Sequence, residues 1–245
     1  MSIPQYDVRS ILAIWACAAL PMGALAWIVA PQLATSLSGE QPFVRALLIC
    51  LTGGLVWQFV LVVGLVGVEQ RSVRWSTVRG ALWLRPPRSP RTGRTGGRLW
   101  WLLVPLILAL GAQEVIPMVG HPANRDLALF LESTSGRQFL SGSWGWFAVI
   151  AAMLVFNTVL GEELLFRGFL LPRMAGAFGR ADWFANGVLF AAYHLHTPWV
   201  IPAALLDTFI LSYPSRRLRS AWMGIAVHSA QSLVIGALVL TLAAG

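Results

Sequence analysis

The 245-residue sequence contains no lysine, only two cysteines and very little charge. Charged residues make up 11% of the chain, whereas soluble domains carry about 25%. A chain with so little polar surface is not expected to fold in water. Cys17 and Cys50 lie inside apolar runs and form no CxxC or Cys/His spacing. We therefore expect both to be small core residues, and no disulfide framework is implied.

All 18 basic residues are Arg, and they give the chain a formal charge of +8 at pH 7. This charge does not indicate nucleic-acid binding, because the Arg residues sit in short loops beside apolar spans, where they orient a membrane protein. Arg without Lys, together with abundant Ala, Leu, Val and Gly, is typical of a GC-rich bacterial genome.

Long uncharged runs indicate membrane spans, since about 20 apolar residues cross roughly 30 Å of hydrocarbon. We predict an all-α fold, a polytopic transmembrane helix bundle of about seven spans with a polar intramembrane cavity. Thr197-Pro198 is expected to separate the fifth span from the sixth. The predicted spans are residues 11–30, 43–68, 99–119, 144–172, 182–197, 198–213 and 220–243.

The chain is predicted to divide into a two-helix N-terminal portion (1–68), a basic loop (69–98) and a five-helix core (99–245). The loop 69–98 holds eight Arg and one Glu. If it is cytoplasmic, 14 of the 18 Arg lie inside and three outside, as the positive-inside rule requires. The sequence therefore predicts a multi-pass protein of the cell membrane with its N-terminus cytoplasmic and its C-terminus external.

The fourth predicted span carries Glu162, Glu163 and Arg167. An ionisable residue inside a bilayer costs about 2.5–3.5 kcal/mol and is a functional candidate. Glu163 and Arg167 are four residues apart and can pair on a helix, which is the structural interpretation. Glu162 points about 100° away from Glu163, so one salt bridge does not account for both carboxylates.

His194 and His228 lie in two further spans. At 1.5 Å per residue, Glu162, His194 and His228 all lie roughly 12–18 Å from the inner boundary. Either His alone is typical of a packing residue, but three spans that bring Glu, His and His to one depth predict a single site. His196 is expected to face the opposite side of its helix from His194. Asp207 is expected either to line the same cavity or to pair with an Arg.

These motifs resemble those of the CPBP intramembrane proteases, which include the CAAX prenyl endopeptidases and the bacterial Abi proteins. The resemblance covers 157–232, less than a third of the chain, and implies a multi-helix fold with a polar cavity that opens toward the cytoplasm. Four residues after the last His, where the family usually has Asn or Asp, this chain has Ser232, preceded by Gln231. The matching residues are Glu162, Glu163, Arg167, Phe190, His194 and His228.

The resemblance implies an intramembrane endopeptidase in which Glu162 and His194 activate water. His228, with Ser232 or Gln231, would then donate to the oxyanion, and Arg167 would fix Glu163. The expected substrate is a membrane-anchored or lipid-modified protein or peptide, and the expected partners are that substrate and membrane lipid, with no nucleic acid.

Two alternatives stay open. Glu162, His194 and His228 could form a three-ligand zinc shell. We favour a reaction without a cofactor, because zinc ligation by all three would leave only Glu163 as a base, and that residue is matched to Arg167. The second alternative is a non-catalytic CPBP-like membrane partner or immunity protein that keeps the fold.

Overall fold

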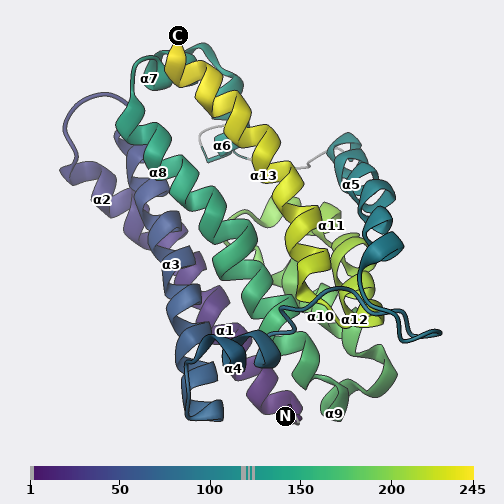
Figure 1. Ribbon diagram of the computed structural model, residues 1–245. Coiled ribbons are helices and arrows are strands. Elements are labelled where there is room, and N and C mark those ends of the chain that lie inside the picture. Colours follow the sequence, from purple (N-terminus) through teal and green to yellow (C-terminus); the bar gives the residue numbers. More distant parts are fainter. Residues whose placement is uncertain (1–2, 117–119, 121, 123–124) are drawn as a thin grey trace.

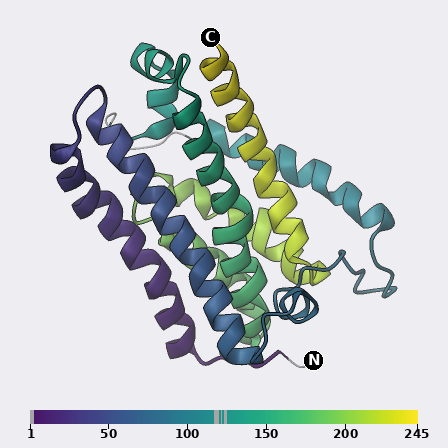
Figure 2. The same cartoon turned by 60° about the vertical axis from the view of Figure 1, so that its left-hand side comes forward.

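The computed structural model describes residues 3–116, 120, 122 and 125–245, which form helices and loops with no β-strand among them. The predicted helical membrane bundle is confirmed. Within the described residues, four helices are long and apolar enough to cross a membrane: Val8–Ser36, Pro42–Gln70, Trp144–Arg173 and Ala221–Ala244. Figures 1 and 2 show these four lying side by side along a common direction.

These four helices match the first, second, fourth and seventh predicted spans, whereas the other three predicted spans are shorter helices. The described part of residues 99–119 gives a 3-10 turn at Gly97–Leu102, α5 (Leu103–Ala112) and a further 3-10 turn at Gln113–Val115. Residues 182–197 give α10 (Asp182–Tyr193). Residues 198–213 break into α11 (Ile201–Ala204) and a π-helical turn (Thr208–Ser212). Pro198 and Pro202 lie in the first turns of the short helices Pro198–Val200 and α11, where a missing N–H costs little. A turn at residues 205–206 then separates α11 from the helical run that continues through Pro214 into α12.

The first long helix consists of α1 (Val8–Ala24), a π-helical turn (Leu25–Val29) and α2 (Ala30–Ser36). The third begins with α8 and continues through π-helical segments to Arg173. The remaining bounds are α3 (Pro42–Gln70), α4 (Trp75–Ala81), α6 (Leu127–Glu132), α7 (Thr134–Leu140), α8 (Trp144–Val155), α9 (Ala175–Phe178), α12 (Tyr213–Leu218) and α13 (Ala221–Ala244).

A proline shapes the contact between α1 and α3. Pro21 lies inside α1 and has no N–H, so the carbonyl of Cys17, four residues earlier, loses its helical donor. The indole N–H of Trp57 on α3 donates to that carbonyl at 2.8 Å. The Cys17 side chain itself is exposed, so the expectation of a core residue was wrong there, while Cys50 is buried as expected.

A buried ion pair between Arg173 and Glu69 connects three chain segments at one end of the bundle. Arg173, which is fully buried, donates to both carboxylate oxygens of Glu69 at 2.7 and 2.6 Å. The Tyr6 hydroxyl donates to the same carboxylate at 2.7 Å. Burial, followed by this hydrogen bond, raises the pKa of Tyr6 to about 12, so the hydroxyl keeps its proton. The N-terminal segment and the ends of two long helices therefore meet at the end predicted to be cytoplasmic.

The two chain ends lie at opposite ends of the bundle (Figure 1). We expect a reporter fused after about residue 90 to be cytoplasmic and one fused at Gly245 to be external, because the Arg-rich loop holds its end of the bundle inside. Accessibility of the two fusions to a membrane-impermeant label measures this. Labelling of both reporters from the same side would contradict the predicted orientation.

Candidate active site

Glu162 and Glu163 lie where the helix 144–173 departs from α-helical geometry. They are flanked by π-helical segments at Phe156–Gly161 and Leu164–Leu170, and such segments are frequent at functional sites. The backbone of α3 approaches closely here, since a methyl group on Gly161 would lie 3.2 Å from the carbonyl oxygen of Leu55. Glu162 is 2% exposed and Glu163 0%, so two carboxylates are buried in an apolar bundle.

Glu163 has two cationic or ionisable partners. Its Oε1 lies 2.8 Å from Nη1 of Arg167, which confirms the predicted pairing. The same oxygen lies 3.1 Å from Nδ1 of His228 on α13, a contact that was not predicted. Gly224, one turn before His228, makes this approach possible, because a methyl group there would collide with Glu163 Oε2. The group Arg167–Glu163–His228 thus joins the third long helix to α13.

The Phe190 ring on α10 connects three of the predicted site residues. The Arg167 guanidinium carbon lies 3.9 Å from the ring centroid. The rings of His194 and His228 lie 5.0 and 6.1 Å away, at 89° and 87° to the Phe190 plane. The motif residues from three parts of the chain therefore come together around one aromatic side chain.

His194 lies just after the end of α10 rather than within a helix, so the prediction of a span over 182–197 placed it wrongly. Its Nδ1 lies 3.0 Å from the Phe190 carbonyl oxygen. A carbonyl can only accept a hydrogen bond, so Nδ1 carries the proton and Nε2 of the neutral ring is an acceptor. His194 is therefore set up to take a proton or to hold a water molecule at Nε2.

His196 does not face away from His194, because the chain leaves helical geometry after Tyr193. The rings of His194 and His196 stack at 5.5 Å and 25°. Asp207 accepts a hydrogen bond from Gln113 at 2.8 Å and interacts electrostatically with Arg167 and His228. Asp207 forms no ion pair with an Arg among the described residues, and its place in a cavity stays a prediction.

Tyr193 and Gln58 belong to the site and were not predicted. Both are fully buried, and the Gln58 amide nitrogen donates to the Tyr193 hydroxyl oxygen at 2.5 Å. The Tyr193 O–H is then available for another acceptor, and this hydroxyl interacts with Glu162. One feature of the sequence could have indicated this site: Gln58 is a polar amide inside the uncharged run 46–68.

Gln231 and Ser232 lie on α13 after His228, and both are half-buried. Two cavities, of about 540 and 230 Å³, lie elsewhere, and none of the eight predicted site residues lines either of them. A polar cavity at the predicted site residues stays a prediction.

Among the residues that the structure describes, no three His, Cys, Asp or Glu side chains lie close enough together to hold a metal ion. Zinc requires ligand atoms at about 2.0–2.3 Å in tetrahedral geometry. Zinc ligation by Glu162, His194 and His228 would therefore require these side chains to move.

Comparison with known proteins bears on the same part of the chain. Residues 144–234 match a family model described as Rce1-like, type II CAAX prenyl endopeptidase Rce1-like. No curated protein and no solved structure matches the chain. The matched segment covers less than half of the sequence but contains all eight predicted site residues. The resemblance seen in the motifs is thus confirmed, since residues 144–234 of this helical membrane protein are similar to the type II CAAX prenyl endopeptidase family.

Proposed function

We propose that this protein is an intramembrane endopeptidase of the cell membrane that hydrolyses a peptide bond of a membrane-anchored or lipid-modified protein. One observation carries this proposal. Arg167, His194 and His228 pack around Phe190, Glu163 pairs with both Arg167 and His228, and Glu162 is buried next to Glu163 and interacts with Tyr193. Ionisable groups inside an apolar bundle are costly unless they have a function. Ion pairing accounts for Glu163 and Arg167, whereas Glu162 has no ion-pair partner among the described residues.

Glu162 and His194 would activate the water. The Glu162 carboxylate takes a proton as the water oxygen attacks the peptide carbonyl carbon, and Nε2 of His194 accepts the second O–H as a hydrogen bond. The C–N bond then breaks, and the proton held by Glu162 passes to the leaving amine. The Tyr193 hydroxyl would position the Glu162 carboxylate, and Gln58 in turn fixes the hydroxyl.

His228 would stabilise the oxyanion. His228 Nδ1 hydrogen-bonds to Glu163. Nε2, on the opposite edge of the ring, is therefore the nitrogen that would face the oxyanion. When the ring carries both protons, Nε2–H can donate to the negative oxygen of the tetrahedral intermediate. Ser232 or Gln231, on the next turn of α13, would supply the second donor. Arg167 would act through Glu163, whose position it fixes.

Tyr193→Phe tests whether this hydroxyl positions Glu162. We expect kcat to fall about tenfold with KM unchanged, since one hydrogen bond to a charged group contributes about 1.5–3 kcal/mol. Tyr213→Phe is a matched control, because Tyr213 is exposed on α12. Equal kcat values for the two variants would remove Tyr193 from the mechanism.

The substrate can be sought in the native membrane. We expect membrane proteomes of a wild-type strain and a Glu162→Ala strain to differ by at least one membrane-anchored precursor that stays uncleaved in the variant. Identical proteomes would favour the non-catalytic alternative, a membrane partner or immunity protein that keeps the fold.

Ser232 is the specific observation behind that alternative, because the family usually has Asn or Asp at this position. If the wild-type protein cleaves nothing and Ser232→Asn confers cleavage, the scaffold is a protease that lacks an oxyanion donor. If neither protein cleaves, the motif residues form a structural network.

A further inference from the structure

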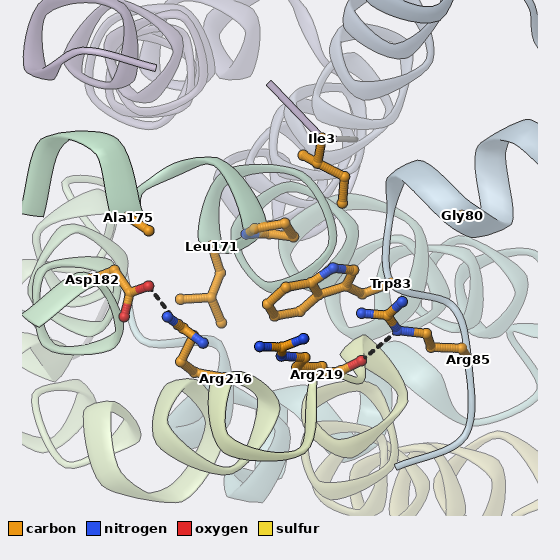
Figure 3. Close-up of a pocket in the computed structure, with 10 residues that line it drawn as sticks. Ile3, Gly80, Trp83, Arg85, Leu171, Ala175, Asp182, Arg216 and Arg219 are labelled. Atoms are coloured by element: carbon orange, nitrogen blue, oxygen red, sulfur yellow. Dashed lines mark hydrogen bonds and ion pairs between the residues drawn. The ribbon is translucent and has the colours of Figure 1, made fainter. Parts of the chain in front are cut away.

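A cavity of about 540 Å³, shown in Figure 3, is lined by none of the eight predicted site residues. Gly80 of α4 and Ala175 of α9 line it, and both helices lie at the same end of the bundle as the N-terminus (Figure 1), which is the end predicted to be cytoplasmic. The charged lining of the cavity consists of Arg85, Arg216 and Arg219 against a single acidic residue, Asp182. A smaller hollow of about 230 Å³ shares Asp182, Arg216 and Arg219 with it and adds two more Arg residues. This part of the surface is therefore concave and strongly basic.

The wall of the cavity is built by hydrogen bonds between segments far apart in the sequence. The Arg85 Nε donates to the Arg219 carbonyl at 2.9 Å, and the Ser220 hydroxyl donates to the Arg85 carbonyl at 2.5 Å. Backbone hydrogen bonds from Ala221 to Trp83 and from Arg88 to Leu218 add two further links. The basic loop is thereby fixed against the corner between α12 and α13, so the cavity is formed before any ligand arrives.

Two residues of this wall hold an unfavourable backbone conformation. Trp83 and Arg219 both have φ of 49°, in the left-handed region that Gly and Asn prefer. Such strain is typical of functional sites.

The positive charges in the cavity are only partly neutralised. Asp182 pairs with Arg216, but among the described residues no carboxylate lies within ion-pair distance of Arg85 or Arg219. Burial, then the nearby charges of Arg219 and Arg88, lower the pKa of Arg85. The Arg85 guanidinium also lies 5.4 Å from the centre of the Trp83 ring. An anion in this space would relieve the repulsion between the guanidinium groups.

We propose that Arg85, Arg216 and Arg219 bind a phosphate group in this cavity. Guanidinium groups offer paired N–H donors that match phosphate oxygens. At the cytoplasmic surface, the phosphate can come from the headgroup of an anionic phospholipid or from a free phosphate in solution. The site does not depend on the proposed peptidase activity, and no step of that reaction uses it.

Binding can be measured on the purified full-length protein in uncharged detergent, without any activity assay. The probes are phosphatidylglycerol, phosphatidylcholine and inorganic phosphate, each titrated while the Tm is recorded. We expect phosphatidylglycerol to raise the Tm and phosphatidylcholine to leave it unchanged. A rise with inorganic phosphate of similar size at similar concentration would assign the site to free phosphate, and a rise with the lipid alone would assign it to a headgroup.

The informative variant is Arg219→Asn, because Asn tolerates the left-handed backbone and the variant should fold at least as well as wild type. We expect its apparent affinity for the stabilising probe to fall about tenfold, which corresponds to the loss of one charge-assisted hydrogen bond. Arg71→Asn is the matched control, since Arg71 has the same kind of backbone, with φ of 49°, and is exposed outside the cavity. Equal loss in both variants, or no stabilisation of wild type by any probe, would overturn the proposal.

Discussion

Glu162→Gln is expected to lower the rate of peptide cleavage about a thousandfold, within the range that a general base contributes. The amide has the same shape as the carboxylate and its oxygen can still accept a hydrogen bond from Tyr193. It cannot take the proton of the attacking water. The Tm and the yield of detergent-extracted protein should stay close to wild type, because Glu162 has no ion-pair partner among the described residues.

Glu163→Gln is the variant whose Tm and activity are compared with those of Glu162→Gln. Glu163 binds both Arg167 and His228, so its loss should lower the Tm as well as the activity. If Glu162→Gln destabilises the protein as much as Glu163→Gln, the two carboxylates do not have separate roles.

Arg167→Met is expected to destabilise the folded protein by about 3–5 kcal/mol, since it leaves a buried carboxylate without its main counter-charge. Glu163 and Arg167 are both fully buried, so water cannot replace the missing partner. Thermal unfolding in detergent measures the loss. Arg9→Met is the matched control, because Arg9 is exposed on α1 and its removal should change stability by about 0.5 kcal/mol or less.

The double variant Glu163→Gln/Arg167→Met should recover part of this stability, because it removes both charges. Activity should not recover, since His228 would still lack its carboxylate partner. A double variant as unstable as Arg167→Met alone would show that the Arg side chain stabilises the fold through packing on Phe190 rather than through its charge.

The sequence predicted the long helices because an uncharged run of about 20 residues has few alternatives in a bilayer. The sequence predicted helices that are too long over 182–213, where α10 ends at Tyr193, before Thr197-Pro198, and a turn at residues 205–206 ends α11. The Glu163–Arg167 pair followed from helical spacing alone. The contact between Glu163 and His228 could not be predicted, because counting residues along a span gives the depth of a side chain but not the direction in which it points.

Other features depend on tertiary structure. His196 was placed wrongly because α10 ends at Tyr193, and the helical rule that separates residues two apart no longer holds there. Gln58 was not predicted because its amide carries no charge and it lies inside an uncharged run. The basic cavity joins Arg85 to Arg219 through loop hydrogen bonds, and no periodic pattern links residues so far apart.

The central claim is that Glu162 and the two motif histidines hydrolyse a peptide bond without a metal ion. The most direct measurement is cleavage of a membrane-anchored reporter peptide by purified, reconstituted protein after exhaustive chelation, with the metal content of the same sample determined. A general base can activate water without a metal ion, whereas a zinc enzyme depends on its ion to lower the pKa of the bound water. We expect cleavage to continue with metal content well below one ion per chain. Cleavage that stops on chelation and returns with zinc would contradict the glutamate mechanism and make Glu162, His194 and His228 metal ligands.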